Sequence, residues 1–158
     1  MRPTTDLYDD HEETVQTCSV QFRDFGTTRA FAGRIRTVRC REDNQLFRSL
    51  LDEPGKGDVV VVDGGGSTAA ALMGDILGAK ALNNGWSGCV IYGAVRDSVE
   101  LATIAVGIKA LGVNPAKSAK TGAGEVDVPV QFGGVTFEPG HWVYCDADGI
   151  LVSPTRIE

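Results

Sequence analysis

Two short apolar runs near the middle of the chain are each followed by a longer segment of mixed polarity. The first run is Asp58–Asp63 (DVVVVD) and the second is Cys89–Gly93 (CVIYG). Short, continuous apolar runs rich in β-branched residues are typical of strands buried on both faces of a sheet. The Ala- and Leu-rich segment 67–84 predicts a helix, and segment 98–111 predicts a second helix that stops at Gly112.

The regions on either side of this centre show β patterns. Residues 18–40 form short alternating runs broken by glycines, and residues 126–152 contain three more such runs, VDVPVQF, GVTFEPG and HWVYCDADGILV. Thr4–Thr14 is polar and acidic and predicts a short N-terminal helix. Asp43 is expected to cap a helix that extends to Leu51.

The order of these elements predicts one α/β domain over residues 1–158, with a central βαβ unit flanked by strands from both ends of the chain. A right-handed crossover between parallel strands places the loops that follow them at the same edge of the sheet. Ligands of such sheets bind at that edge. Segments 64–77 and 93–97 follow the two central strands, so we expect them to lie close together.

Gly74-Asp75 interrupts the helical pattern of residues 67–84. A glycine inside a helix costs about 1 kcal/mol relative to alanine, so its presence calls for a reason. One interpretation is a short helix over residues 67–73, followed by a new helix that begins near Asp75. The first amides of that helix, those of Asp75, Ile76 and Leu77, would bind a carboxylate or phosphate. The other is a continuous helix, with Gly74 against a close-packed strand and Asp75 in solvent. The pattern alone leaves both open.

Arg96-Asp97 follows the second apolar run, with twenty residues between Asp75 and this pair. A guanidinium binds a carboxylate through two parallel N–H donors and can polarise a keto oxygen. The Asp97 carboxylate is a hard oxygen ligand of the kind that Mg²⁺ or Mn²⁺ prefers. The alternative is structural: Asp97 would act as the N-cap of the helix predicted to follow.

A glycine run, Gly64–Ala69 (GGGSTA), formally matches the G-x-G-x-x-A pattern of dinucleotide-binding turns. The next strand, however, ends in Tyr92-Gly93, where such sites carry an acid for a ribose hydroxyl. The pattern therefore favours a sharp turn after Asp63 over a nucleotide site.

Composition narrows the class of protein. The chain has 158 residues and a formal net charge of −6, which argues against direct binding to nucleic acid. No C-x-x-C motif, apolar membrane span or signal-peptide core is visible, so we expect a cytoplasmic protein that does not bind membranes. Only His11 and His141 are present, so neither a His-rich zinc site nor a Ser-His-Asp triad has support. Lys117 and Lys120 lie in a polar segment that either binds an anion, provides a Schiff-base lysine or is solvated.

These residues together resemble a known family. Segments 59–97 and 107–152 are similar to the regulator of ribonuclease activity A family and its sister 4-hydroxy-4-methyl-2-oxoglutarate aldolases. The resemblance implies an α/β/β sandwich of the swivelling-domain type, assembled as a homotrimer with sites between subunits. Some family members carry a menaquinone methyltransferase label, but this chain shows no methyl-donor site.

The aldolase branch of the family carries Asp, twenty intervening residues and Arg-Asp, as this chain does at Asp75, Arg96 and Asp97. The resemblance implies a class II lyase that uses Mg²⁺ or Mn²⁺ to cleave 4-hydroxy-4-methyl-2-oxoglutarate to pyruvate and to decarboxylate oxaloacetate. The substrate would lie on the backbone amides of Gly74, Asp75, Ile76 and Leu77. Arg96 would bind its C2 oxygen, Asp75 would orient a proton-carrying water, and Asp97 would hold the metal.

The other branch implies a different function, a protein that binds and inhibits a ribonuclease E-type enzyme. It typically lacks the acids found here, so Asp75 and Asp97 favour the lyase. Longer aldolases of the family add an acidic residue from a C-terminal extension to a neighbouring site, whereas this sequence ends at Glu158. The resemblance therefore favours oxaloacetate decarboxylation over cleavage of the methylated substrate.

Overall fold

A computed structural model describes the whole chain, Met1–Glu158, as a mixed α/β domain. Its helices are α1 (Thr4–His11), α2 (Gln45–Leu51), α3 (Asp75–Asn83) and α4 (Ser98–Leu101). Its strands are β1 (Gln16–Thr17), β2 (Arg23–Asp24), β3 (Phe31–Arg39), β4 (Val59–Asp63), β5 (Ala71–Met73), β6 (Gly88–Val95), β7 (Gly107–Val113), β8 (Glu125–Val126), β9 (Val130–Phe132), β10 (Val135–Phe137), β11 (Trp142–Asp146) and β12 (Gly149–Ser153).

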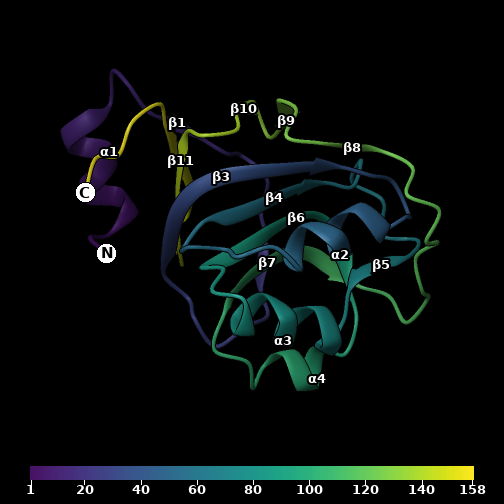
Figure 1. Cartoon of the computed structure of the whole chain (residues 1–158). Helices are drawn as coiled ribbons and strands as arrows, with labels where there is room; N and C mark the ends of the chain where they lie inside the picture. The colour runs from purple at the N-terminus through teal and green to yellow at the C-terminus, as the bar shows by residue number, and fades with distance from the viewer.

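The centre of the fold is a parallel sheet formed by β3, β4, β6 and β7 in that order. The predicted apolar runs are β4 and β6, and both are buried along nearly their whole length. One face of this sheet packs against α2, α3 and α4, which lie next to one another in Figure 1. This arrangement confirms the predicted central βαβ unit.

The other face of the sheet is covered by β structure. Strand β3 is long and strongly curved, and it continues the sheet through antiparallel β11 and β12. The hairpin β9–β10 packs on this face, where its apolar side chains form one cluster with residues of β4, β11 and β12. Helices on one side and two β layers make the α/β/β arrangement that was expected.

None of the helices has the length and apolar character needed to span a membrane.

The helix predicted over residues 67–84 is only half correct. Helix α3 begins at Asp75, whereas Ala71–Met73 is the short strand β5, which pairs in parallel with the end of β6. The first interpretation of Gly74, a new helix near Asp75, is therefore confirmed, but no helix precedes it. Pairing with β6 overrides the helical propensity of the Ala-rich segment because it buries Ala71, Leu72 and Met73 completely or nearly so.

The helix predicted over residues 98–111 is wrong beyond its first turn. Helix α4 ends at Leu101, and Gly107–Val113 is strand β7, paired with β6. Gly107 lets the start of β7 pack closely against Phe31. A Cβ at this position would lie 2.2 Å from the ring of Phe31, so only glycine fits there.

Candidate functional site

The residues singled out in the sequence meet at one edge of the parallel sheet. Strand β5 leads into Gly74 and the start of α3, and β6 leads into Arg96 and Asp97. The two loops touch: the backbone N–H of Arg96 donates to the carbonyl of Met73 at 2.8 Å. The loops that follow β5 and β6 therefore lie side by side at one edge of the sheet, as the right-handed crossover predicted.

Gly74 lies close against the side chains of the Arg96-Asp97 pair. A Cβ at this position would lie 2.5 Å from Oδ2 of Asp97 and 3.3 Å from Cγ of Arg96. The backbone of Gly74 is extended, at φ −127° and ψ −163°, so its dihedral angles do not require glycine. The space does, because any side chain here would displace the Arg96-Asp97 pair.

Asp97 contacts the N-termini of two helices. It is the N-cap residue of α4, as the structural alternative from the sequence had it, and its carbonyl accepts a hydrogen bond from the N–H of Leu101 at 2.8 Å. Its side chain makes no cap bond to α4; Oδ2 instead accepts a hydrogen bond from the backbone N–H of Asp75, at the start of α3, at 3.0 Å. Asp97 also has left-handed backbone angles, φ 56° and ψ 43°, which Asp tolerates better than most residues.

The Asp97–Asp75 bond changes one sequence expectation. The first amides of a helix have no intrahelical partner and can bind an anion. Here the amide of Asp75 is occupied by Asp97, and the N–H of Gly78 bonds the Gly74 carbonyl at 3.0 Å. The amides that remain for a ligand are those of Gly74, Ile76 and Leu77.

Arg96 lies between Asp97 and the segment that follows β7. Its Nε is 4.0 Å from Oδ2 of Asp97, and its Nη1 donates to the carbonyl of Pro115 at 3.4 Å. The side chain is 35% exposed, so part of the guanidinium remains accessible. Two weak contacts orient this group while leaving donors available for a ligand.

These groups line a cavity of about 210 Å³ between β5, the start of α3 and the end of β6. The structure adds residues from two further segments that sequence reasoning did not place here. The added polar residues, from α2 with its N-cap and from the segment after β7, are Asn44, Arg48, Lys117, Ser118 and Lys120. Lys117 and Lys120 carried an anion-site signal in the sequence, whereas Arg48 and Asn44 carried none.

The cavity is more cationic than the rest of this acidic protein. Arg48, Arg96, Lys117 and Lys120 line it against two carboxylates, those of Asp75 and Asp97. The Nζ of Lys120 donates at 3.0 Å to the neutral side chain of Asn44, whose own amide donates to the carbonyl of Leu72. A cavity with four cations and two anions suits a small, negatively charged ligand that can complement both signs.

The glycine run forms a turn. The amides of Gly64 and Gly66 both donate to the carbonyl of Tyr92, and Gly65 and Gly66 have positive φ angles of 68° and 74°. No helix follows the run, so the strand–turn–helix context of a dinucleotide site is missing.

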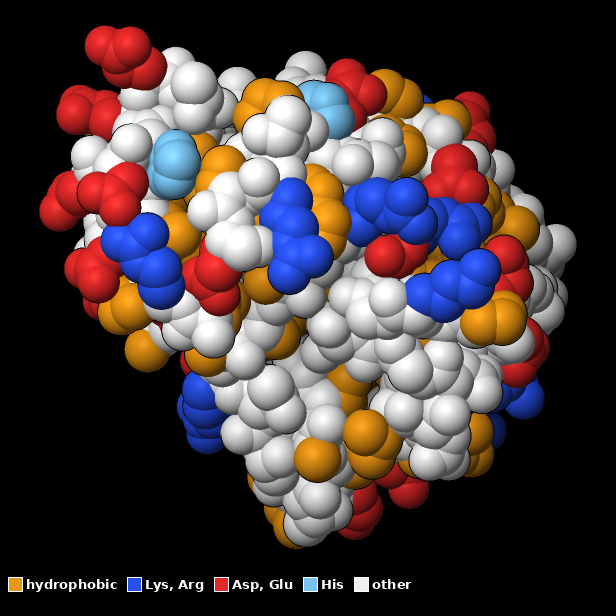
Figure 2. Space-filling model, turned by 60° about the vertical axis from the view of Figure 1, so that its left-hand side comes forward, with side chains coloured by type: hydrophobic (Ala, Val, Ile, Leu, Met, Phe, Trp, Pro, Cys, Tyr) orange, Lys and Arg blue, Asp and Glu red, His pale blue; other side chains and the backbone are white.

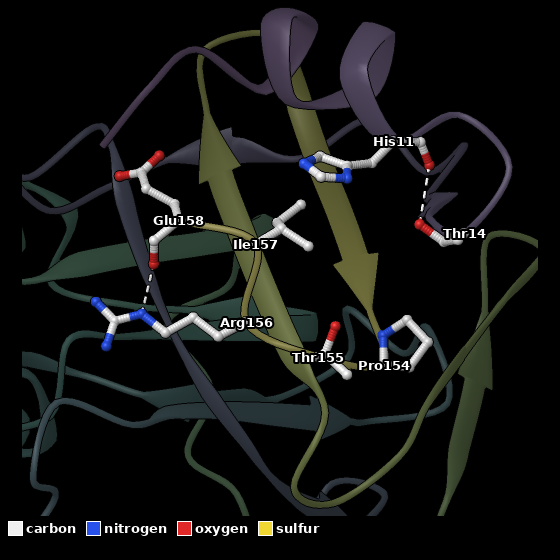
Figure 3. A pocket seen from close by; sticks show the side chains of 7 residues that line it. All are labelled: His11, Thr14, Pro154, Thr155, Arg156, Ile157 and Glu158. Carbon is white, nitrogen blue, oxygen red and sulfur yellow. Dashed lines mark hydrogen bonds between the residues drawn. The ribbon is translucent and has the colours of Figure 1, made fainter.

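A second hollow lies on another part of the molecule, between α1 and the last residues of the chain (Figure 3). It is about 760 Å³ and wide open. Its polar groups bond locally: Thr14 donates its hydroxyl to the carbonyl of His11, and Nε of Arg156 donates to the carbonyl of Glu158. It has no convergent set of carboxylates and cations like that at the sheet edge.

Comparison with known proteins identifies the family and the fold of the chain. A family model described as RraA-like, Aldolase/RraA, matches residues 4–152. A structure of the RNA-processing inhibitor RraA from Thermus thermophilus is 46% identical, with a TM-score of 0.97, and the match covers 100% of this chain and 96% of that chain.

Two other solved structures are similar. One, described as an S-adenosylmethionine:2-dimethylmenaquinone methyltransferase from Geobacillus kaustophilus HTA426, is 43% identical, with a TM-score of 0.97 and coverage of 99% and 97% of the two chains. The other is Streptomyces coelicolor RraAS2, described as an unusual member of the RNase ES inhibitor RraA protein family. It is 28% identical, with a TM-score of 0.76 and coverage of 96% and 77%.

Proposed function

The chain belongs to the RraA-like family, and from that premise we propose that it is a metal-dependent lyase that releases pyruvate from small keto-dicarboxylates. The reactions are retro-aldol cleavage of 4-hydroxy-4-methyl-2-oxoglutarate and decarboxylation of oxaloacetate. One observation carries the proposal: Asp75, Arg96 and Asp97 line a single cavity with excess positive charge and with unpaired helix amides at its wall.

The oxygen donors of the cavity suit a hard divalent cation. Asp75 and Asp97 both line it, and Oδ1 of Asp97 is not engaged by the hydrogen bond that holds Oδ2. Mg²⁺ commonly binds one or two protein carboxylates and completes its shell with water and substrate oxygens. The chain has no group of three or more acidic, histidine or cysteine side chains around one point, so substrate oxygens would be needed.

In this proposal Asp97 holds Mg²⁺ or Mn²⁺, directly or through water. When bound, the cation would supply Lewis-acid polarisation of the keto group. The carboxylate of the pyruvyl unit would accept hydrogen bonds from the amides of Ile76 and Leu77.

Two protein side chains would act directly in the reaction: Arg96 at the enolate oxygen and Asp75 in proton transfer. When the C3–C4 bond breaks, its electron pair stays on C3 and spreads to the C2 oxygen as an enolate. A guanidinium fixed at that oxygen stabilises the charge as it develops. A water oriented by Asp75 would take the proton of the C4 hydroxyl in the retro-aldol reaction and return a proton to C3.

The remaining cations indicate the substrate class. Arg48, Lys117 and Lys120 line the cavity, and the one protein partner of the Lys120 ammonium there is the amide of Asn44. A second carboxylate on the substrate would complement these charges. The proposal therefore favours keto-dicarboxylates over monocarboxylates such as pyruvate adducts of neutral aldehydes.

Assembly as a homotrimer, implied by the resemblance, is part of the proposal. Ile76, in the first turn of α3, is 67% exposed, and Val99, in α4, is 77% exposed. Large apolar side chains exposed beside a cavity are commonly covered by a partner, and a second copy of the chain would both bury them and close the site. Sedimentation equilibrium at micromolar concentration measures the mass directly.

The test is pyruvate release from each substrate, with Mg²⁺ and with EDTA, above the rate given by the metal alone. Wild type is compared with Arg96→Ala and with Arg39→Ala, which removes an exposed arginine paired with Glu125 outside the cavity. We expect metal-dependent turnover that is lost in Arg96→Ala and kept in Arg39→Ala. Turnover that survives Arg96→Ala, or none above the metal background, would contradict the proposal.

A second candidate is a protein that binds and inhibits a ribonuclease E-type enzyme. Two structural relatives, 46% and 28% identical, are described as an RNA-processing inhibitor and as a member of an RNase ES inhibitor family. This chain has an exposed acidic surface in and after α1, formed by Asp6, Asp9, Asp10, Glu12 and Glu13. Acidic side chains also gather at one side of the face in Figure 2.

Such a surface would associate with a basic, RNA-binding segment of a ribonuclease, and salt would weaken the complex. Binding to a purified ribonuclease E-type enzyme at low and high salt measures this. Replacing Asp9 and Asp10 with Asn should weaken the complex, whereas Asp97→Asn should leave it unchanged. Absence of a complex at low salt would exclude this function.

A further inference from the structure

The segment that follows β7 lines one wall of the cavity and is hydrogen-bonded on both sides. The amide of Ala71 donates to the carbonyl of Ala116, and the hydroxyl of Ser118 donates to the carbonyl of Ala71. On the other side, the amide of Ala119 donates to the carbonyl of Glu42. Residues 116–122 therefore lie between β5 and the residues before α2, and they carry Lys117 and Lys120.

Asp43 holds the far end of this segment. Its carboxylate accepts hydrogen bonds from the amide of Thr121 at 2.7 Å, from the hydroxyl of Thr121 and from the amide of Gly122 at 3.3 Å. Asp43 is 3% exposed, and none of its bonded partners is a cation. A buried carboxylate without a counter-ion depends on such neutral donors for its stability.

The capping role expected from the sequence accounts for a minor part of these contacts. Asn44 is the N-cap residue of α2, and one oxygen of Asp43 accepts the amide of Gln45 at 3.1 Å. The other three donors come from Thr121 and Gly122, which are 78 and 79 residues away in the sequence. Asp43 therefore acts mainly across the fold rather than along its own helix.

Asp43 and Asn44 divide one task between them. Asp43 fixes the backbone of Thr121, the residue next to Lys120, while Oδ1 of Asn44 accepts a hydrogen bond from Nζ of Lys120. Asp43 and Asn44, which are adjacent in the sequence, therefore fix the backbone next to Lys120 and the ammonium group at the end of its side chain. Flexible lysine side chains otherwise lose considerable rotamer entropy when they bind, so fixing one beforehand favours ligand binding.

We infer that Asp43 is a positioning residue that latches residues 117–122 and so presents Lys120 to the second carboxylate of a keto-dicarboxylate substrate. The inference rests on the proposed lyase function and adds a determinant of its specificity. Loss of the latch should weaken binding of substrates with two carboxylates and leave enolate formation from a monocarboxylate intact, because Arg96 and Asp97 are held by other contacts.

Asp43→Asn is the direct test. Asparagine keeps the size of the side chain but replaces an acceptor oxygen with a donor, which opposes an N–H or O–H of Thr121 or Gly122. We expect the KM for oxaloacetate to rise about tenfold, the effect of one misplaced charge-assisted contact. Deuterium exchange into the methyl group of pyruvate, which requires the enolate but no second carboxylate, should be unaffected. A change of equal size in both reactions, or in neither, would overturn the inference.

Four further variants guard against a general effect on folding. Thr121→Val removes the hydroxyl donor alone and should raise the same KM by a smaller factor. Asp127→Asn removes a carboxylate that pairs with Arg36 outside the cavity and should change neither reaction. Combining Asp43→Asn with Lys120→Met should raise the KM no further than Lys120→Met alone, because both act through one contact. Additive effects would contradict the latch.

Amide hydrogen exchange separates failure of the latch from failure of the proposed lyase. Asp43→Asn should speed exchange at residues 117–122 and leave α3 unchanged. If the wild-type protein has no lyase activity while exchange speeds up in this way, the proposed function is wrong and the latch stands. Unchanged exchange at residues 117–122 would overturn the latch whatever the activity.

Discussion

The carboxylate of Asp97 accepts a hydrogen bond from the backbone amide of Asp75 at 3.0 Å, across 22 residues of sequence. The residue that ends the loop after β6 thereby caps the helix that follows β5. One carboxylate oxygen closes the α3 terminus while the other remains available to the cavity. This bond ties the two halves of the candidate site to each other and makes the roles of Asp97 in stability and in chemistry separable by mutation.

Asp97→Asn should separate these roles. Asparagine retains an acceptor for the Asp75 amide but loses the negative charge, so stability should stay within about 0.5 kcal/mol while metal-dependent turnover is lost. Asp97→Ala should lose turnover and, in addition, about 1 kcal/mol of unfolding free energy with the cap. Urea unfolding beside oxaloacetate kinetics measures both. Equal stability of the two variants would show that the cap contributes nothing.

Gly74→Ala should disturb the site without disturbing the backbone. The added Cβ would lie 2.5 Å from Oδ2 of Asp97, so the Arg96-Asp97 pair must move. A displacement of about 1 Å can cost about 100-fold in rate, and we expect a fall of that order in kcat/KM. Gly112→Ala is the matched control, since its nearest neighbour would be an Arg23 nitrogen at 4.0 Å. Full activity in Gly74→Ala would show that the close approach is not required.

Asp43 should make stability depend on acid pH. The hydroxyl of Thr121, with the amides of Thr121, Gln45 and Gly122, lowers the pKa of Asp43 to about 2. In the unfolded chain an Asp pKa is about 3.9, so the unfolded state binds the proton first as pH falls. The contribution is therefore complete above pH 4 or so, and it is lost as pH falls through about 2.

Unfolding free energies of wild type and Asp43→Asn, measured between pH 2 and pH 6 or so, test this. The variant should be less stable at the upper end of that range, and the difference should shrink as the wild-type carboxylate becomes protonated. A difference that does not change with pH would mean that Asp43 has an ordinary pKa in the folded protein.

Lys109 should be needed for stability rather than for chemistry. It is 3% exposed on β7, outside the cavity, and its Nζ donates to Asp24 of β2 at 2.9 Å. Lys109→Met would leave the partly buried Asp24 with only a longer contact, at 3.7 Å, to the exposed Arg29. Removing one partner of a buried ion pair costs about 3 kcal/mol, and we expect a destabilisation of up to that size. Lys80→Met, which breaks a pair with the more exposed Asp52, should cost under about 1 kcal/mol. Urea unfolding at one fixed protomer concentration compares the two.

Much of the fold could be predicted from local pattern. The β-branched run of β4 and the apolar run of β6 identified the two central strands, because such segments are stable only when both faces are buried. Gly74 marked a break that proved to be the start of α3, since glycine is unfavourable inside a helix. The rule that ligands bind at the carboxyl ends of parallel strands then predicted that Asp75, Arg96 and Asp97 lie close together.

The failures have one physical cause. Segments 67–73 and 107–111 are rich in Ala, Leu and Ile, which suit a buried helix and a buried strand alike. The strands that form there, Ala71–Met73 and the start of β7, are decided by hydrogen bonding to β6. No local pattern contains those partners.

The sequence by itself thus determined the parallel centre of the sheet, the break at Gly74 and the three residues expected to carry the chemistry. Only the tertiary structure decided that Asp97 caps α3, that Asn44 and Arg48 line the cavity, and that Asp43 holds the segment with Lys120. Those relationships join residues 22 to 79 positions apart. Hydrogen-bond partners at such separations are fixed by how the layers pack, whereas periodicity and turn signals report only on neighbouring residues.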